Sequence, residues 1–467
     1  MRTMCPTKET PSPLSHPLCR GALSVALALA LGGCAAWSPP AQLASTAPVA
    51  STSVNPLAQW WQRFNDPLLG TLVTQALQAN TSIRSAQAAL QQSRALRDVS
   101  AAGLLPTLSA SGSAQRGRAN GMDASNSWHA GLDASWEPDI FGAQRSTLNA
   151  AEADTQALQA TLADVQVSVA AEVALAYVQL RGQQAQLVIA RNNLASQQET
   201  LQITDWRAQA GLITSLEVEQ ARTASEQTSA QIPQLEAGIA KTSHGLAVLT
   251  GQRPQALLTQ LQQTQPIPQP PAALTLDIAA QTLRQRPDVR AAELRITAAL
   301  ARVSAADAAR YPGFAIGGSF GLNALTLGAL GNSASLVSSL LGSLSIPLFD
   351  GGARGAQVLA QEAALEQARA NYQAVVLSAL EDVANALVAL SGDRARLTHL
   401  QAAADAAGHA ALLAQQRYRS GLIDFQTVLQ TQRTLLTTQG GVASSTADIS
   451  ADHVRLYKAL GGGWNFP

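Results

Sequence analysis

The sequence has few of the residues that build an aromatic core or a disulfide framework. Aromatic residues make up 4% of the chain and charged residues 13%, whereas hydrophobic residues make up 46%. This composition favours long helices with small contact residues over an aromatic-packed globular core. The formal net charge is zero, so the basic footprint of a nucleic-acid-binding protein is missing.

Cysteine and histidine are also too few and too scattered to build a site. Two of the three cysteines, Cys5 and Cys19, fall in an N-terminal segment that we expect to be removed, so one cysteine remains and no disulfide can form. No group of residues has the spacing of zinc ligands, and Gly351–Gly355 lacks the Lys-Ser/Thr of a phosphate-binding loop. We therefore expect no enzyme activity and no metal or nucleotide cofactor. The histidines are His16, His129, His244, His399, His409 and His453.

The N-terminus is typical of a bacterial lipoprotein signal. Basic residues precede an apolar run, Gly21–Leu31, which is too short to span a bilayer. The run ends in Leu31-Gly32-Gly33-Cys34, which resembles a lipobox, in which Cys34 carries a covalent lipid and becomes the first mature residue. An ordinary signal peptide that ends near a cysteine is the alternative. We predict a signal peptide over residues 1–33 and a Ser-, Pro- and Ala-rich tether over residues 34–56.

The rest of the chain is a tandem repeat. Leu77–Ala86 matches Leu283–Ala292 at an offset of 206 residues, and Ala210–Gln220 matches Ser420–Gln430 at an offset of 210. Several matches at nearly one offset are hard to obtain by chance, so we infer a duplication whose period is far too long for a solenoid. We predict a first repeat over residues 57–255, a Pro/Gln-rich linker over 256–275 and a second repeat over 276–467.

Each repeat contains a long helical hairpin. Apolar residues keep a seven-residue spacing, which is typical of coiled-coil packing; in the second repeat they are Val376, Leu380, Val383, Leu387, Leu390 and Leu397. Proline-free stretches over 145–209 and 354–420 predict helices of about 95 Å. These helices turn at Gly211 and Gly421, and the returning arms end near Gly251 and Gly461. Shorter helices over 67–103 and 276–309 would extend the returning arms end to end.

Four segments between the helices lack the seven-residue spacing of apolar residues that the helices have. They contain Gly, Ser, Thr and bulky residues with Pro near several ends, and their lengths fit membrane-spanning β-strands. Soluble hairpins packed on the helices would have the same pattern. Asp133, Glu137 and Asp139 are candidates for a pore mouth, but the sequence favours solvated strand ends for them. The predicted strands cover residues 105–115, 127–137, 314–325 and 335–348.

Four strands cannot close around a pore, and open strand edges cannot lie in hydrocarbon. Three chains would supply twelve strands and, with two hairpins each, a wall of near six-fold symmetry. The predicted fold class is therefore mostly α with a small β part. Duplicated antiparallel helical hairpins form an α-barrel, and four strands per chain contribute to a trimeric twelve-stranded outer-membrane β-barrel.

Several motifs resemble the TolC-like outer-membrane factors, and more narrowly the lipoprotein branch that serves resistance–nodulation–division (RND) efflux pumps. They are the lipobox, the duplication, Trp60–Leu69, Arg286–Arg290, Arg417–Leu422 and the ending Leu456–Trp464. The resemblance implies a homotrimer in the cell outer membrane that extends into the periplasm, with Gly211 and Gly421 at the periplasmic tips. It also implies a periplasmic adaptor protein and an inner-membrane RND pump as partners, and passive conduction of drugs, metal ions or other toxic compounds.

The tip of the second hairpin departs from this family. Relatives carry acidic residues there that form a constricting ring, whereas the aligned positions in this chain are Gln426 and Gln430. Asp424 is the nearest carboxylate, and Glu217 and Glu219 lie in the first hairpin. We predict a tip that is closed by packing and polar contacts, with Asp424, Gln426 and Gln430 as the candidate gate.

Two other functions fit parts of the sequence. A lipid-anchored coiled-coil scaffold or adaptor would bridge membranes without a pore, but it would not need strand-like segments at the same place in both repeats. An outer-membrane factor for protein secretion would share the fold, and the lipobox and the terminal motif favour efflux over it.

Overall fold

The computed structural model describes residues 59–118, 123–270 and 285–462, all of which belong to the unit Asn55–Pro467. The signal peptide, Cys34 and the tether lie outside the described residues. Helices and strands follow in the order η2 (Trp60–Phe64), α2 (Pro67–Ala79), α3 (Thr81–Ala102), β1 (Thr107–Gly117), β2 (Ser125–Trp136), α4 (Ala143–Gln209), α5 (Ser215–Leu249), α6 (Leu258–Leu261), α8 (Pro287–Ala308), β3 (Gly313–Ala324), η3 (Leu327–Ala329), η4 (Ser333–Ser335), β4 (Leu336–Ser345), α9 (Ala353–Arg419) and α10 (Phe425–Ala459).

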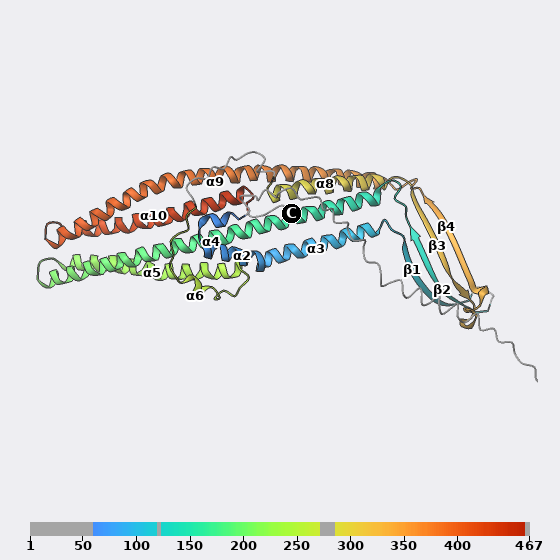
Figure 1. Ribbon diagram of the computed structural model, residues 1–467, viewed down its shortest axis with the longest axis horizontal. Helices are drawn as coiled ribbons and strands as arrows, with labels where there is room; N and C mark the ends of the chain where they lie inside the picture. Colours follow the sequence, from blue (N-terminus) through green and yellow to red (C-terminus); the bar gives the residue numbers. More distant parts are fainter. Residues whose placement is uncertain (1–58, 119–122, 271–284, 463–467) are drawn as a thin grey trace, which may run out of the picture. The chain divides into compact units, whose positions relative to one another are not determined.

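Two helices of equal length dominate the fold. The helices α4 and α9 have 67 residues each, which corresponds to about 100 Å. The returning helices α5 and α10 have 35 residues each and form antiparallel hairpins with α4 and α9. Both hairpin turns lie at one end of the unit and the four strands at the other (Figure 1). The predicted long helices are confirmed to within two residues at each end.

Small side chains let these helices approach one another closely. The strand-proximal half of α4 buries an alanine at nearly every turn: Ala150, Ala153, Ala157, Ala160 and Ala163 are each at most 5% exposed. An alanine interface loses little side-chain entropy and favours the helix. The scarcity of aromatic residues follows from this kind of contact.

The first predicted short helix, over 67–103, is wrong in one respect, because the chain breaks at Asn80. Asn80 has an extended backbone (φ −62°, ψ 135°) and caps α3 by accepting hydrogen bonds from the amides of Ser82 and Ile83. Asparagine is a favoured N-cap because its side chain satisfies amides that the helix leaves free. The chain therefore forms two helices, α2 and α3, instead of one. In the second repeat the predicted helix over 276–309 is wrong at Gln285 and Arg286, which are not helical, so α8 begins at Pro287. It ends at Ala308, within one residue of the prediction, and residues 276–284 lie outside the described residues.

Each returning helix meets a short helix end to end through an equivalent contact. The Asn80 side-chain amide donates to the carbonyl of Leu249, 2.8 Å away. In the second repeat Arg286 has nearly the same backbone conformation (φ −62°, ψ 131°) and donates to the carbonyl of Ala459 at 2.9 Å. These bonds satisfy carbonyls that the ends of α5 and α10 leave without a helical partner. The prediction of end-to-end extension is confirmed.

Glycine is required where these helix ends meet. Gly251 and Gly461 both have positive φ (73° and 70°), a conformation that glycine adopts without steric cost. A Cβ on Gly251 would lie 2.5 Å from the carbonyl oxygen of Ala79, and one on Gly461 would lie 3.2 Å from the Cα of Arg286. The first junction is therefore the tighter of the two.

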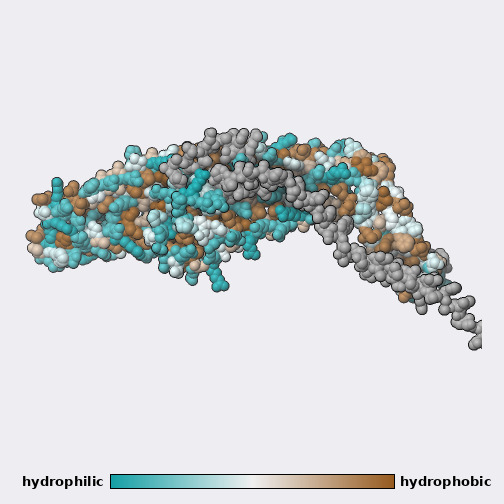
Figure 2. Space-filling view, in the orientation of Figure 1, coloured by the Kyte–Doolittle hydropathy of each residue, from teal (hydrophilic) through white to brown (hydrophobic). Residues whose placement is uncertain are grey.

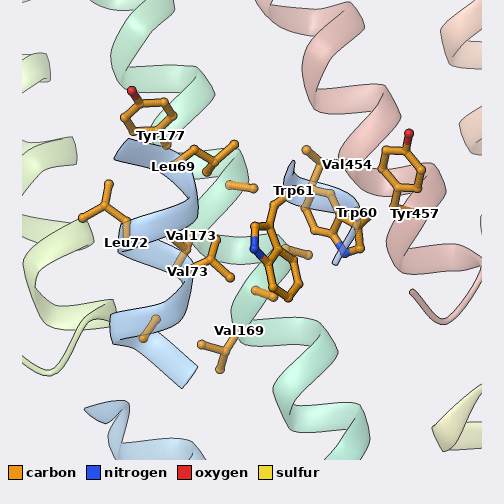
Figure 3. Packing of buried hydrophobic residues seen from close by; sticks show 14 of the residues in the cluster. Trp60, Trp61, Leu69, Leu72, Val73, Val169, Val173, Tyr177, Val454 and Tyr457 are labelled. Carbon is orange, nitrogen blue, oxygen red and sulfur yellow. The ribbon is translucent and has the colours of Figure 1, made fainter. Parts of the chain in front are cut away.

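The main hydrophobic core joins the beginning of the described chain to its end. Trp60 stacks on Tyr457 with ring centroids 5.2 Å apart, and both residues are at most 1% exposed. Figure 3 shows these rings between η2 and α10, with Trp61 and Val454 next to Trp60; Leu69 of α2 and Val173 of α4 belong to the same cluster and lie on the other side of Trp61. This aromatic cluster is local, so it holds the repeats together at one level along the hairpins.

The described part of the linker binds to both repeats. On α4, Arg181 donates to the carbonyl of Gln263 and Gln184 donates to that of Leu261, each at 2.7 Å. On α10, the hydroxyl of Ser450 donates to the carbonyl of Pro268 at 2.7 Å. The linker thus ties α4 of the first repeat to α10 of the second.

The four strands form one antiparallel sheet in the order β1-β2-β3-β4. The observed strands agree with the four predicted segments to within three residues at each end. The strands β2 and β3 come from different repeats and pair with each other, with Trp136 opposite Ile316. The sheet therefore contains a boundary between the two repeats at its centre.

The two long helices differ in how much of their surface is covered. The helix α4 packs against α3 and α5 of its own repeat and against α8 and α10 of the other. Over the described residues, α9 packs extensively against α8 and α10 only. The predicted heptad seam of α9 is buried at Val383 and Leu390, whereas Leu380 and Leu387 are 47% and 40% exposed.

The junction at Gly251 gives a direct test of this architecture. Gly211 has the same positive φ (71°) but open space where a Cβ would lie, so Gly211→Ala should cost about 1–2 kcal/mol of unfolding free energy. Gly251→Ala carries the same backbone cost and a carbonyl clash, and should cost about 2–5 kcal/mol. Thermal unfolding of the detergent-purified variants, followed by circular dichroism, checks the order. Equal melting temperatures would contradict the end-to-end contact.

Candidate functional site: the two-faced sheet and the hairpin tips

The strand register sorts the side chains of the sheet into two unlike faces. Residues opposite each other in an antiparallel ladder point to the same face, and successive residues alternate. One face is mostly apolar; its residues include Leu108, Trp128, Leu132, Trp136, Phe314, Ile316, Phe320, Leu322, Leu340 and Leu344. The other face is mostly polar; its residues include Ser109, Ser111, Ser113, Gln115, Ser127, His129, Asp133, Ser319, Asn323, Ser339 and Ser343.

Hydroxyl groups link neighbouring strands across the polar face. Thr107 and Ser135 share a hydrogen bond of 3.0 Å, and Ser319 and Ser339 share one of 2.8 Å. The Ser111 hydroxyl donates to the carboxylate of Asp133 at 2.8 Å. Asp133 therefore lies within β2 on the polar face, whereas the sequence suggested a solvated strand end.

The apolar face is exposed in the single chain. Leu108 is 70% exposed and Leu340 83% exposed, although both are leucines in regular strands. In Figure 2 the surface over the strands is mostly brown and pale, and the teal of polar residues is spread mainly over the helices. A sheet with one apolar and one polar face, in strands of 10 to 12 residues, has the pattern of a transmembrane β-barrel wall.

Both edges of this sheet are open among the described residues. Within that part of the chain, each of β1 and β4 pairs with one neighbour only, and every residue of either strand is exposed. The two long helices also contain stretches apolar enough to cross a membrane, but buried core helices pass the same test, and half of the stretch in α4 is buried. The sheet is therefore the better candidate for the membrane-spanning part.

At the other end of the unit, Gly211 and Gly421 form the turns of the two hairpins. Both have positive φ (71° and 73°). The amide of Gly211 donates to the carbonyl of Ala208, and the amide of Leu212 donates to that of Arg207, each at 2.9 Å. The same two bonds recur 210 residues later, from Gly421 and Leu422. This arrangement ends a helix with its last carbonyls satisfied, and it gives both tips the same backbone.

The candidate gate residue Asp424 caps the N-terminus of α10. Its carboxylate accepts hydrogen bonds from the amide of Thr427 at 2.9 Å and from the Thr427 hydroxyl at 2.6 Å. Both hydrogen bonds lower the pKa of Asp424, and the bond from the Thr427 hydroxyl has the larger effect. In the first hairpin Thr214 caps α5, and Glu217 completes a capping box with it. The Thr214 hydroxyl lowers the pKa of Glu217, so both acids stay ionised near their helix ends.

The other candidate residues of the tips lie on exposed helix surface. The side-chain amide of Gln426 donates to Gln220 of the first hairpin at 2.8 Å, whereas Gln430 is exposed. Glu219 forms an ion pair with Arg222 on its own helix. Among these described residues, Gln426 alone forms a hydrogen bond between the two hairpins, so one of the candidate gate residues has an observed partner.

The structure also joins the hairpin tips through residues that the sequence did not single out. Arg207 of α4 donates to the carbonyl of Tyr418 at 2.7 Å, and its guanidinium lies 4.6 Å from the centre of the Tyr418 ring. Arg419 forms an ion pair with Glu199. Tyr418 is 3% exposed and belongs to a second apolar cluster with Phe425. The motif Arg417–Leu422 contained Tyr418 and Arg419, but its pattern did not indicate which side chains form contacts between the hairpins, and it did not include Arg207 or Glu199.

The histidines do not come together in the part of the chain that the structure describes. No group of three or more potential metal ligands is present among those residues. His129 lies on the polar face of the sheet, and His453 is buried in α10, where its Nε2 contacts Arg394 at 3.2 Å. His16 lies outside the described residues.

The cap at Asp424 can be separated from a gating charge by two substitutions. Asp424→Asn removes the charge but keeps an oxygen that can accept from Thr427, and asparagine is also a favoured N-cap. Asp424→Ala removes both. We expect the Thr427 amide to exchange with deuterium as slowly in the asparagine variant as in the parent at neutral pH, and clearly faster in the alanine variant. Because the pKa of Asp424 is lowered, the parent should lose this protection only when the pH falls through that lowered value.

Single-channel conductance of the same variants tests the gating role. An asparagine variant that opens more readily or loses cation preference while its amide stays protected would show that the charge itself holds the tip closed. Unchanged conductance would leave Asp424 with the capping role alone.

Comparison with known proteins places this geometry in one family. The family model described as outer membrane efflux protein matches residues 72–252 and 278–462. The chain is 30% identical to the probable efflux pump outer membrane protein SepC of Pseudomonas putida over 95% of this chain and 97% of that protein. It is 34% identical to the pyoverdine export outer membrane protein OpmQ of the same species, over 94% and 96% of the two chains.

Solved structures give the same result. The outer-membrane channel OprN has a TM-score of 0.83 and 36% identity, over 87% of this chain and 93% of that one. The relatives are channel proteins of the outer membrane, and the apolar face of the sheet fits that location. The chain belongs to the outer membrane efflux protein family and is the outer-membrane channel component of an efflux pump.

Proposed function

We propose that this chain is one third of a lipid-anchored homotrimer that conducts small toxic molecules passively out of the cell. An inner-membrane RND pump supplies the energy, and a periplasmic adaptor protein contacts the hairpin tips. Cys34 carries the lipid that holds the mature N-terminus in the outer membrane.

The main observation in support of a trimer is the exposed apolar surface on one side of α9. Val167 and Val178 of α4 are 3% and 1% exposed, but the residues 210 positions later, Leu377 and Val388 of α9, are 66% and 72% exposed. The helix α4 has the second repeat beside it, and α9 has no such neighbour among the described residues. Because the repeats are alike, the first repeat of another copy fits beside α9.

The sheet leads to the same assembly. Open edges leave backbone N–H and C=O groups unpaired, which hydrocarbon does not tolerate. A contact between β4 of one copy and β1 of the next uses different surfaces on the two partners, and such contacts close into a ring when the rotation between copies divides a full turn. Three copies supply twelve strands, enough to surround a channel, whereas eight strands barely enclose a filled interior.

The hairpin tips support contact with an adaptor and a closed resting state. Leu212 and Leu422 follow the tip glycines and are 68% and 73% exposed. Each tip therefore has an exposed apolar side chain that the adaptor can contact. Within one chain the hairpins are joined by Arg207 to Tyr418 and by Gln426 to Gln220. We therefore propose that polar contacts close this tip, since the acidic ring positions of relatives hold Gln426 and Gln430 here.

The names of the relatives support a broad class of exported substrates. Their names include toluene, solvent and pyoverdine export, and we propose drugs, metal ions or other small toxic compounds for this chain. A protein-secretion channel would share the architecture. A poreless scaffold is disfavoured because it would not need an apolar sheet face with open edges.

Val388→Asp tests the assembly. The aspartate would place an unpaired charge in the proposed interface, which costs several kcal/mol per copy, so we expect the variant to purify as a monomer in mild detergent. Gln179→Asp is the matched control, because Gln179 stays exposed on α4 although that helix has neighbours on both sides. A trimeric Val388→Asp protein would contradict the proposed interface.

Susceptibility of a deletion strain tests the function. Loss of the gene should increase sensitivity to drugs, metals or solvents, and the parent and the Gln179→Asp variant should restore resistance where Val388→Asp does not. Cysteine cross-linking at Leu422 should capture the adaptor. Unchanged susceptibility to all three compound classes would remove the efflux role.

A further inference from the structure

The strand pairing of the first repeat recurs residue by residue in the second repeat. In the first repeat Thr107 pairs with Ser135, and in the second Gly313 pairs with Ser345. Gly313 lies 206 residues after Thr107, and Ser345 lies 210 residues after Ser135. Each pair of the β3–β4 ladder has a counterpart in the β1–β2 ladder. The β1 residue of the counterpart lies 206 positions before the β3 residue, and its β2 residue lies 210 positions before the β4 residue. The four-residue difference between the offsets lies in the longer loop between β3 and β4.

The same two offsets can be applied to the residue pairs that join the two repeats. Inside the chain β2 pairs with β3, with Asp133 opposite Ser319 and Ser135 opposite Gly317. Adding 210 to the β2 residue and subtracting 206 from the β3 residue gives a pair between β4 and β1. Because β4 and β1 are the two outer edges of the sheet, these partners belong to different copies of the chain.

We propose that β4 of one copy pairs with β1 of the next in the antiparallel register that places Ser343 opposite Ser113. Ser345 then lies opposite Ser111, and Leu341 lies opposite Gln115. This inference rests on the proposed trimer and specifies how its barrel closes. The occupant of each open edge is a second copy of this chain.

Most of the side-chain pairs agree with this register, and the exception is Leu341, an apolar residue of the polar face. The two serine pairs lie on the polar face and repeat the in-chain hydroxyl pairs Thr107–Ser135 and Ser319–Ser339. On the apolar face Leu344 lies opposite Gly112, so a large side chain meets a position without one. A slip by one residue would turn the apolar side chains of β4 toward the polar face, which a barrel in hydrocarbon does not tolerate.

The backbone spacing makes the register testable by disulfide formation. A Cβ on Gly321 would lie 2.8 Å from the Cα of Gly131, its partner across the β2–β3 ladder. Such close approach is typical of non-hydrogen-bonded pairs, which recur at every second residue of an antiparallel ladder. The pair Asp133–Ser319 is two residues away, so the equivalent Ser343 and Ser113 inherit the narrow spacing. Cβ atoms in such pairs are about 4.5–5.5 Å apart, within small backbone adjustment of a disulfide.

The experiment compares cysteine pairs in the full-length protein, in which Cys5 and Cys19 are expected to be removed and Cys34 to be lipidated. Ser343→Cys with Ser113→Cys should give covalent trimers on denaturing gels after mild oxidation, and a reductant should abolish them. Ser343→Cys with Ser111→Cys, or with Gln115→Cys, reports a shift of two residues in either direction. Ser319→Cys with Ser339→Cys is the in-chain control for access of the oxidant to the polar face.

The outcomes separate the register from the assembly. Covalent trimers from the 343/113 pair, with clearly fewer from both shifted pairs, support the register. Preferential cross-linking of a shifted pair overturns the register, and so does the absence of any interchain cross-link in a protein that is trimeric in mild detergent. A parent protein that is monomeric in mild detergent would instead overturn the proposed trimer.

Discussion

The backbone of the sheet cannot satisfy its own hydrogen bonds in a membrane. One face of the sheet carries Leu108, Leu132 and Leu340 on the outside, which suits hydrocarbon, yet both edge strands offer unpaired amides and carbonyls. Hydrocarbon supplies no partner for these groups. In the proposed trimer, the uncovered surface of α9 and the open strand edges are both covered by the neighbouring copies.

The duplication gives the two repeats equivalent contacts, and in the proposed trimer the contacts between repeats recur between chains. At each helix junction a side chain from an extended N-cap residue reaches the end of the returning helix, but the first junction uses neutral Asn80 and the second uses Arg286. Arg286 also binds Asp288 and Asp382, so the second junction reaches α9 as well. The repeats have thus kept the geometry and changed the chemistry at places where their surroundings differ.

Periodic features of this fold could be predicted from the sequence, and single contacts could not. The seven-residue seam gave the long helices to within two residues, because small and apolar side chains repeat over many turns. The break at Asn80 was missed because an N-cap inside a helical pattern competes with continued helix by one local hydrogen bond. The exposure of Leu380 and Leu387 was not predicted, because a seven-residue spacing does not indicate which apolar positions find a neighbour in the same chain. At the tips, the bond from Arg207 to Tyr418 depends on how two hairpins approach, which no spacing along the chain encodes. The cap at Asp424 is a local contact with Thr427, three residues later, so its spacing does lie in the sequence.

Native mass spectrometry of the purified mature protein in mild detergent tests the central claim most directly, because it counts chains and detects the lipid in one spectrum. The account predicts a single assembly of three chains, each carrying a diacylglycerol-type mass at its N-terminus. A stable monomer or dimer that keeps its sheet would contradict the account, since four or eight strands could not close the edges around a channel.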